Sequence, residues 1–288
     1  MTRLCRRLFL GLLLVFLAAN PFAGGALAQP ATPSQPTQPT MGPGSDDYAY
    51  AKTASVTVGD APTGATIFTP DGASPAQLDA MPIVLFIPGF LASNPETYGR
   101  WIDHLVRRGT IVLFPNYQTA NLLAVPPETY PANLLAGVRS GVEYLTTLGI
   151  HDVRARSLHV VGHSLGAVLA VSYAQNAARL KFPRVATLSV IEPGGCGTCG
   201  TFPDITVPID LNVQLPADIL AQLVVGNDDT TVGDADARKL WPLFSDIPPR
   251  NRDYVTVRSD RHGKPPLLAD HAMVGTGGGP NGEEDAMD

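Results

Sequence analysis

The chain has 288 residues, of which 44% are hydrophobic and 16% charged, so it has enough apolar material for one large domain or two small ones. Its formal net charge is −6, which argues against nucleic acid or an anionic membrane surface as the main partner. This balance suits a soluble protein that acts on neutral substrates.

Residues 1–28 have the three parts of a secretory signal peptide. Three arginines precede the apolar run L-F-L-G-L-L-L-V-F-L-A-A, and A-L-A at 26–28 supplies the small residues of a cleavage site. The apolar run is about a dozen residues, whereas a membrane-spanning helix needs ~20. We therefore expect cleavage after Ala28, no integral membrane span afterwards, and a secreted or periplasmic location. Removal of this segment takes the formal charge from −6 to −9, because it holds three arginines and no acidic residue.

Residues 29–45, rich in Pro and Thr, predict an extended linker ahead of a single domain over residues 46–288. After signal cleavage two cysteines remain, Cys196 and Cys199, in G-G-C-G-T-C-G. In an exported protein this spacing favours a small local disulfide. A redox-active C-x-x-C normally opens a helix, which the glycines here do not favour, and a zinc site would need two further ligands that are not apparent nearby.

From about residue 50 onwards, strand and helix patterns alternate along the chain. A-S-V-T-V-G and G-A-T-I-F-T-P predict an antiparallel hairpin at a sheet edge. Further strands are predicted in P-I-V-L-F-I-P-G-F, T-I-V-L-F-P-N-Y, S-L-H-V-V-G-H, R-V-A-T-L-S-V-I-E-P, I-L-A-Q-L-V-V-G and R-D-Y-V-T-V-R. Helices are predicted in residues 94–109, 131–149, 165–180 and 235–244. This alternation predicts βαβ units around a mostly parallel sheet, in one α/β domain.

Ser164 lies between two glycines, in G-H-S-L-G, where a strand pattern gives way to a helix pattern. Small residues at such a point allow a strained turn that presents the serine hydroxyl above the end of a sheet. The helix N-terminus adds a field that favours negative charge. A serine becomes a nucleophile only with a base and with donors for the oxyanion. His163 is not predicted to be that base, because its side chain should point away from its neighbour's hydroxyl.

With these residues the chain resembles the α/β-hydrolase family over residues 50 to 275. P-G-F-L-A and R-W-I-D-H-L-V-R-R-G are similar to the secreted lipase, cutinase and polyester-hydrolase branch, although Ala167 stands where many cutinase-like enzymes have a further glycine. The resemblance implies the α/β-hydrolase fold, with helices on both faces of a mostly parallel sheet. It also implies that the backbone N–H groups of Phe90 and Leu165 bind the oxyanion. The C-terminal G-P-N-G-E-E-D-A-M-D lacks the family's last amphipathic helix, so we expect a trimmed domain or an incomplete sequence.

The resemblance further implies an acid after the strand I-L-A-Q-L-V-V-G. The family pattern G-x-x-D-x-x-V is matched by G-N-D-D-T-T-V, which makes Asp229 the predicted acid. Asp228 and Asp234 are nearby alternatives. Glu192 is another, because some relatives take the acid from the end of the preceding strand.

The histidine base must follow the acid in the chain. His271, in A-D-H-A-M, is favoured because this segment is similar to the histidine loop of secreted members, and His262 is the alternative. His104, His151 and His159 precede the acid and are interpreted as surface or packed residues.

These residues predict an exported serine hydrolase that cleaves small-molecule or polymeric carboxylic esters through an acyl-enzyme on Ser164, with no metal or organic cofactor. An amidase, a thioesterase or a dienelactone-type hydrolase with the same triad stays open, as does a non-catalytic binding protein of this fold. Few residues separate Glu192 from the next strand, which leaves little room for a lid. An open cleft near Phe90, Leu91 and Tyr98 is expected, suited to short-chain or polymeric esters. The oligomeric state is not predicted.

Overall fold

A computed structural model describes residues 40, 42, 45, 47–119, 125–153, 157–197, 205–262 and 266–275. The predicted signal peptide and most of the predicted linker lie outside these residues, as do Cys199 and residues 276–288.

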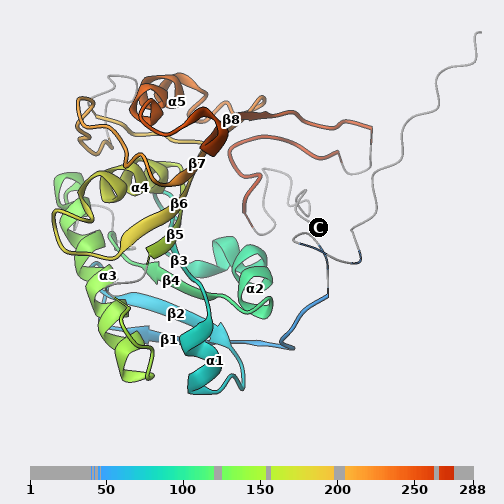
Figure 1. Ribbon diagram of the computed structural model, residues 1–288. Coiled ribbons are helices and arrows are strands. Elements are labelled where there is room, and N and C mark those ends of the chain that lie inside the picture. Colours follow the sequence, from blue (N-terminus) through green and yellow to red (C-terminus); the bar gives the residue numbers. More distant parts are fainter. Residues whose placement is uncertain are drawn as a thin grey trace, which may run out of the picture. The chain divides into compact units, whose positions relative to one another are not determined.

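One sheet of eight strands runs through the described residues, in the order β1-β2-β4-β3-β5-β6-β7-β8 (Figure 1). The strands are β1 (Thr53–Val58), β2 (Ala65–Pro70), β3 (Ile83–Ile87), β4 (Ile111–Pro115), β5 (Ser157–His163), β6 (Arg184–Ile191), β7 (Leu220–Gly226) and β8 (Arg252–Val257). β1 pairs antiparallel with β2, and β2 antiparallel with β4, whereas all pairs from β4 to β8 are parallel. The parallel strands therefore end at one common edge of the sheet.

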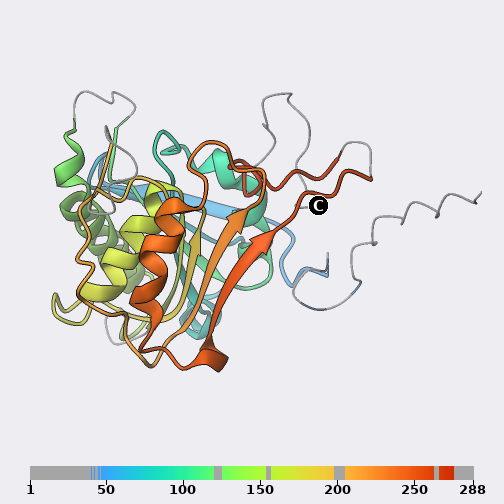
Figure 2. The same ribbon diagram turned by 90° about the horizontal axis from the view of Figure 1, so that it is seen from above.

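The helices cover both faces of this sheet. They are α1 (Pro75–Ala80), α2 (Gly99–Arg107), α3 (Tyr130–Thr147), α4 (Leu165–Asn176) and α5 (Ala235–Leu240), with 3₁₀ turns at Pro95–Tyr98, Pro127–Thr129, Trp241–Phe244 and Pro249–Asn251. α3, α4 and α5 lie on one face and α2 on the other (Figures 1 and 2). Two hydrophobic clusters match these layers, a large one containing α3 and α4 and a smaller one containing α2.

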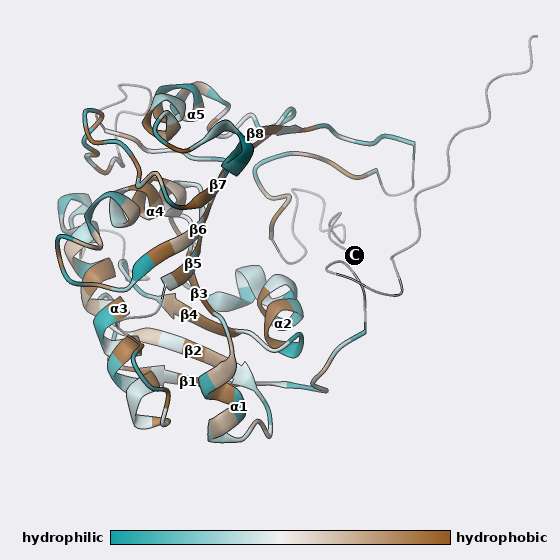
Figure 3. Cartoon of the chain, viewed as in Figure 1, coloured by the Kyte–Doolittle hydropathy of each residue, from teal (hydrophilic) through white to brown (hydrophobic). Residues whose placement is uncertain are grey.

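The apolar central strands explain why the sheet is covered on both faces. Every residue of β3 and β4 is buried. Successive side chains of a strand point to opposite faces, so Leu85 joins the large cluster while Val84 and Phe86 join the smaller one. Figure 3 shows the same distribution, with strongly hydrophobic central strands and a paler β1–β2 edge. Continuous apolar strands of this kind are typical of parallel sheets.

The predicted hairpin and the alternation of strands and helices are confirmed, with four differences. The helix predicted over 94–109 starts as the 3₁₀ turn Pro95–Tyr98 and is α-helical only over Gly99–Arg107. Helix α1 was not predicted, although Ser74 and Gln77 form a capping box at its start. The helix predicted over 165–180 ends at Asn176. The helix predicted over 235–244 ends as α5 at Leu240 and continues as a 3₁₀ turn that contains Pro242, since proline has no N–H for an α-helical hydrogen bond.

In the part of the chain that the structure describes, none of the helices is long and apolar enough to pass through a membrane.

Candidate active site

Ser164 is the single residue that connects β5, which ends at His163, to α4, which begins at Leu165. Its backbone has φ 55° and ψ −125°, a conformation that is strained for a residue with a side chain. The Ser164 N–H donates to the Ile191 carbonyl oxygen at 3.0 Å, which ties the turn to the end of β6. Such a turn lifts the hydroxyl above the carboxyl edge of the sheet, and Ser164 is accordingly only half-buried.

The two glycines around Ser164 are required by close backbone contacts. A β-carbon at Gly162 would lie 2.3 Å from the Gly166 carbonyl oxygen. A β-carbon at Gly166 would lie 2.2 Å from the carbonyl oxygens of Ile87 and Pro88. β3, β5 and α4 therefore approach one another at this turn as closely as glycine permits, which is the physical reason for the G-x-S-x-G spacing.

The structure brings Ser164, His271 and Asp229 into one hydrogen-bonded chain. His271 Nε2 lies 2.9 Å from Ser164 Oγ, and His271 Nδ1 lies 2.9 Å from Asp229 Oδ2. A carboxylate can only accept here, so Nδ1 carries the proton and donates, and Nε2 is left to accept the serine proton. The three groups have the arrangement that nucleophilic serine chemistry requires.

Asp229 is held in its ionised form by its hydrogen bonds. Its Oδ1 accepts from the N–H groups of Thr231 and Val232 at 2.8 and 3.0 Å, while Oδ2 faces His271. Burial alone would raise the pKa of Asp229, but the hydrogen bonds from His271 and the two N–H groups outweigh it and lower the pKa. A charged carboxylate therefore fixes the orientation of the imidazole ring.

The loop that carries His271 is anchored on both sides of that residue. Ala269, Met273 and Val274 are buried in the smaller hydrophobic cluster, beside α2. The Ala269 carbonyl oxygen accepts from Asp228 N–H at 3.0 Å, and a β-carbon on Gly226 would lie 2.2 Å from that same oxygen. These contacts hold the loop against the end of β7.

The loop after β3 brings Phe90 close to the serine. A β-carbon on Gly89 would lie 3.2 Å from Ser164 Cβ. The N–H groups on either side of Phe90 are already used, since Gly89 N–H donates to Tyr98 Oη at 2.9 Å and Leu91 N–H to Gln118 Oε1 at 3.0 Å. No hydrogen bond from the N–H groups of Phe90 or Leu165 is found among the described residues. These two donors are therefore available to a ligand atom beside Ser164.

His163 lies behind His271 and links the two loops of the site. Its Nε2 lies 3.0 Å from the His271 carbonyl oxygen, so it donates, and its Nδ1 accepts from the Tyr98 hydroxyl at 2.9 Å. Burial, and then the nearby His271, lower the pKa of His163 to about 3, so its ring is neutral near pH 7. The sequence prediction that His163 is not the base agrees with these contacts, but the link itself was missed. No local pattern reveals it, because Tyr98 and His163 are far apart in the chain.

Glu192, the alternative acid at the end of β6, is also near His271. Its Oε2 lies 3.9 Å from His271 Nδ1, a full ångström farther than Asp229 Oδ2. Its side chain is 0% exposed. Asp229, and not Glu192, is therefore the residue within hydrogen-bond distance of the ring.

The remaining candidate acids and the second candidate base lie elsewhere. Asp228 accepts from the Ser259 hydroxyl at 2.7 Å and pairs with Arg261, and Asp234 pairs with Arg238 at 2.6 Å. His262 is exposed, with its Nδ1 2.7 Å from Asp260 Oδ1. None of these carboxylates or this imidazole is within hydrogen-bond distance of Ser164 or His271 in the contacts of the described residues.

The other predicted features are placed as follows. His104 and His159 are half-buried and His151 is exposed, as interpreted from the sequence. Cys196 is buried, but Cys199 lies outside the described residues, so the disulfide stays a prediction. Tyr98 was expected to line an open cleft, which is wrong: it is 1% exposed, because its hydroxyl group binds Gly89 and His163 inside the protein.

One cluster in the described part of the chain has the residue types of a metal site. His163, Glu192 and His271 each offer a possible ligand atom, and these atoms lie within 4.8 Å of one another. All four ring nitrogens, however, already have hydrogen-bond partners in Tyr98, Ser164, Asp229 and the His271 carbonyl group. We assign no metal to this cluster.

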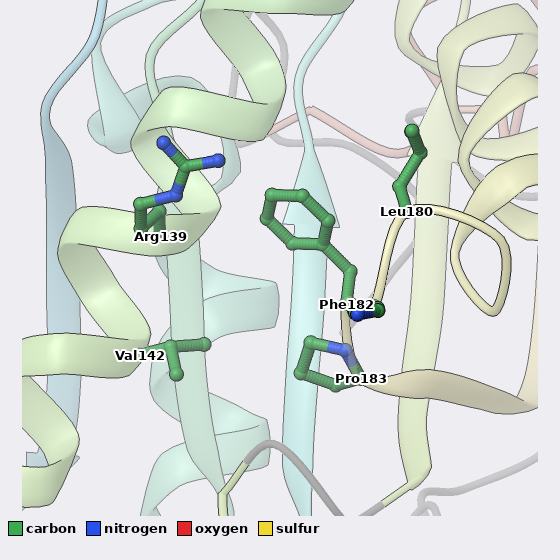
Figure 4. Close-up of a pocket in the computed structure, with 6 residues that line it drawn as sticks. Arg139, Val142, Leu180, Phe182 and Pro183 are labelled. Carbon is green, nitrogen blue, oxygen red and sulfur yellow. The ribbon is translucent and has the colours of Figure 1, made fainter.

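A separate hollow lies at the opposite end of the sheet. Its lining is Arg139, Val142, Leu180, Lys181, Phe182 and Pro183, five of which are labelled in Figure 4. The Arg139 guanidinium carbon lies 5.6 Å from the centre of the Phe182 ring. This hollow adjoins the start of β6. Ser164 lies at the other end of that strand, where its N–H binds Ile191, so the hollow is remote from the active site.

Neither a protein-family profile nor a curated protein sequence matches the chain. A solved structure that is similar is carboxyl esterase 2 from the mycorrhizal fungus Tuber melanosporum, with 18% sequence identity and a TM-score of 0.50. The match covers 74% of this chain and 78% of that one. Together with the mostly parallel sheet of eight strands, this likeness shows that the chain has the α/β-hydrolase fold, as the sequence predicted.

Proposed function

We propose that the protein is a serine hydrolase that cleaves carboxylic esters through an acyl-enzyme on Ser164. One observation carries this proposal: the strained Ser164 turn presents its hydroxyl 2.9 Å from His271 Nε2, and Asp229 orients that ring from the other side. A non-catalytic binding protein of the same fold would not need a serine, a histidine and a carboxylate joined in this order by hydrogen bonds.

In the proposed reaction Ser164 Oγ attacks the ester carbonyl carbon while His271 Nε2 takes the serine proton. Asp229 stabilises the imidazolium, and the N–H groups of Phe90 and Leu165 bind the oxyanion. His271 then gives the proton to the alcohol oxygen, the carbon–oxygen bond breaks, and the acyl group stays on Ser164. Water attacks the acyl-enzyme with His271 as base, which releases the carboxylic acid and restores the serine.

An ester is the favoured substrate class for two reasons. The structurally similar fungal protein is described as a carboxyl esterase. Beside the proposed oxyanion donors, Leu91 is 63% exposed and Phe90 is half-buried, which supplies an apolar surface for an acyl group or a polymer segment. We propose short-chain or polymeric esters, because such substrates do not require a deep acyl pocket.

The proposed chemistry is tested by turnover of p-nitrophenyl acetate and butyrate beside a matched thioester and a matched anilide. We expect the esters to be hydrolysed fastest and Ser164→Ala to lose activity by roughly 10⁴-fold or more. Faster turnover of the anilide or the thioester would move the assignment to an amidase or a thioesterase. No turnover by folded wild-type protein would favour a non-catalytic binding protein. Faster hydrolysis of emulsified long-chain triglyceride than of butyrate would contradict the short-chain proposal.

We also propose export of the chain and a disulfide between Cys196 and Cys199. The charge and apolar pattern of residues 1–28 supports export, and the glycine-rich spacing of the cysteines supports the disulfide. N-terminal sequencing of protein recovered outside the cytoplasm should begin at Gln29. Thiol labelling of that protein should find no free cysteine without reductant, and a retained residue 1 or two free thiols would contradict these two proposals.

A further inference from the structure

Glu192 is a buried carboxylic acid that the proposed mechanism leaves unused. It directly follows β6, with a left-handed φ of 45°, and its side chain is 0% exposed. Its Oε2 lies 3.9 Å from His271 Nδ1 and 3.5 Å from His163 Nε2. Glu192 therefore faces the same ring nitrogen that donates to Asp229.

The surroundings of Glu192 favour its neutral form near pH 7. Burial raises its pKa to about 8, with smaller contributions from the negative charges of Asp229 and Asp270, and the nearby Gly226 N–H offsets them only in part. Neither carboxyl oxygen makes a well-formed hydrogen bond to another described residue. The two histidine rings are the other titratable groups that face it.

Asp229, and not Glu192, accepts the hydrogen bond from His271 because its own carboxylate is held in place by further hydrogen bonds. Its Oδ2 is within hydrogen-bond distance of Nδ1, and its Oδ1 holds two backbone N–H groups. A histidine base needs only one carboxylate at Nδ1. Two ionised carboxylates at one nitrogen would repel each other, so the charge of Asp229 adds to burial in favouring the protonated form of Glu192.

We infer that Glu192 is a second acid for His271, placed to accept the Nδ1–H hydrogen bond when the Asp229 carboxylate is removed. This inference rests on the proposed function. A movement of about 1 Å would bring Oε2 to hydrogen-bond distance. Glu192 first releases its proton to solvent, and its carboxylate then stabilises the imidazolium that forms when Ser164 transfers its proton to Nε2. That proton leaves with the alcohol, so no further reactant is needed, and Glu192 acts through His271 as a positioning residue.

The geometry predicts an unusual order of activity for substitutions of Asp229. In Asp229→Asn, the N–H groups of Thr231 and Val232 hold the amide oxygen, so the amide nitrogen faces His271 Nδ1. That nitrogen donates, which forces the proton off Nδ1 and makes the ring unable to take the serine proton. Asp229→Ala leaves Nδ1–H free to turn to Glu192. Asp229→Ala should therefore retain more activity than Asp229→Asn, although asparagine is closer to aspartate in shape.

The experiment measures kcat and KM for p-nitrophenyl butyrate between pH 6 and pH 9.5, with Ser164→Ala rates subtracted. The variants are Asp229→Ala and Asp229→Asn, each alone and with Glu192→Gln, together with Glu192→Gln alone. We expect Asp229→Ala to exceed Asp229→Asn by about 10-fold or more, with kcat rising with pH as Glu192 ionises, at a lower pH than in wild type because the Asp229 charge that helps to raise the pKa of Glu192 is gone. Adding Glu192→Gln should remove this alkaline rise and lower kcat about 10-fold further, a larger factor than in the wild-type background.

Equal activity of Asp229→Ala and the Asp229→Ala/Glu192→Gln double variant at pH 9 would overturn the inference, as would a kcat for Asp229→Ala that does not rise with pH. Inactive wild type would instead overturn the proposed function. Circular dichroism checks that each variant is folded. If Glu192→Gln does not fold, Glu192→Asp replaces it: its carboxylate is withdrawn by one methylene group and should likewise lose the alkaline rise, whereas retention of the rise would contradict the inference.

Discussion

Gly166 lies two residues after Ser164, where β3 and α4 approach so closely that only a residue without a side chain fits between them. A β-carbon there would lie 2.2 Å from two backbone oxygens, which cannot move aside as a flexible side chain would. The local strain of Ser164, with φ 55°, is held by this close packing. At the scale of single residues, the site therefore depends on the absence of a side chain at Gly162 and Gly166 as much as on its polar groups.

Gly166→Ala is predicted to destabilise the protein by about 3 kcal/mol or more and to abolish ester hydrolysis, because β3 and α4 must separate. Gly72→Ala is the control: Gly72 has a positive φ of 78°, which Gly166 does not have, but a β-carbon at Gly72 meets nothing within 4 Å. It should cost only about 1–2 kcal/mol and leave activity intact. Urea unfolding and p-nitrophenyl butyrate turnover measure both effects. Similar losses of stability and activity in the two variants would contradict close packing as the reason for Gly166.

Single residues also show how far the sequence could predict the site. Ser164 follows from a motif at a strand boundary, Asp229 and His271 were favoured by the family resemblance, and the structure brings the three together. The sequence left His262 open, because both histidines follow the last strand and only three-dimensional contacts separate them. The burial of Glu192 could not be predicted either, since a charged residue after an apolar strand is more often solvated.

At the scale of elements, the loop after β3 and the loop that carries His271 are joined through buried side chains. Gly89 N–H donates to Tyr98, the Tyr98 hydroxyl donates to His163, and His163 donates to the His271 carbonyl oxygen. The proposed oxyanion donor and the proposed base are therefore held in one frame. A shift of about 1 Å in such a frame is enough to cost a large factor in rate.

Tyr98→Phe is predicted to lower kcat about 10- to 100-fold with a smaller change in KM, because it breaks this link and leaves the Gly89 N–H without a partner. Tyr173→Phe is a matched control. Tyr173, on α4, is also buried and donates its hydroxyl hydrogen to the Pro183 carbonyl oxygen at 2.8 Å, but this contact lies just before β6, at the end of the sheet away from the site. Both variants should lose about 1–3 kcal/mol of stability. A loss of kcat in Tyr173→Phe as large as in Tyr98→Phe would mean that stability alone explains the effect.

Most helices and strands were predictable because the burial of each element leaves a recognisable pattern of apolar residues in the sequence. β3 and β4 are continuous apolar runs since both faces of the sheet are covered. Helix α1 was missed because it is only six residues long, with a single buried side chain, Leu78, so it has no apolar periodicity to detect. Its capping box was the signal that could have found it.

At the scale of the whole molecule, two buried groups couple folding to pH in opposite directions. The pKa of His163 is lowered to about 3 in the folded protein, against about 6.5 when unfolded. The unfolded chain thus binds more protons between these values, and stability rises with pH there. The pKa of Glu192 is raised from 4.5 to about 8, so the folded protein binds more protons between those values, and stability falls as pH rises. From pH 6.5 to 8, of these two groups, only Glu192 contributes.

The free energy of unfolding is therefore predicted to fall between pH 6.5 and 8 in wild type, by up to about 1.4 kcal/mol per pH unit from this group. Glu192→Gln should flatten that decrease, because glutamine cannot ionise. Urea unfolding of the two proteins at matched ionic strength gives the comparison. Parallel curves for wild type and Glu192→Gln would show that Glu192 is already ionised at pH 6.5.

The measurement that tests the central claim most directly is covalent labelling with a fluorophosphonate, with the modified residue identified by peptide mass spectrometry. We predict that wild type is labelled on Ser164 and that labelling is lost in Ser164→Ala. It should be slowed at least 100-fold in His271→Ala, since the serine then has no base, and be unchanged in His262→Ala. Labelling of another residue, or of folded His271→Ala at the wild-type rate, would contradict the assignment of Ser164 and His271 as nucleophile and base.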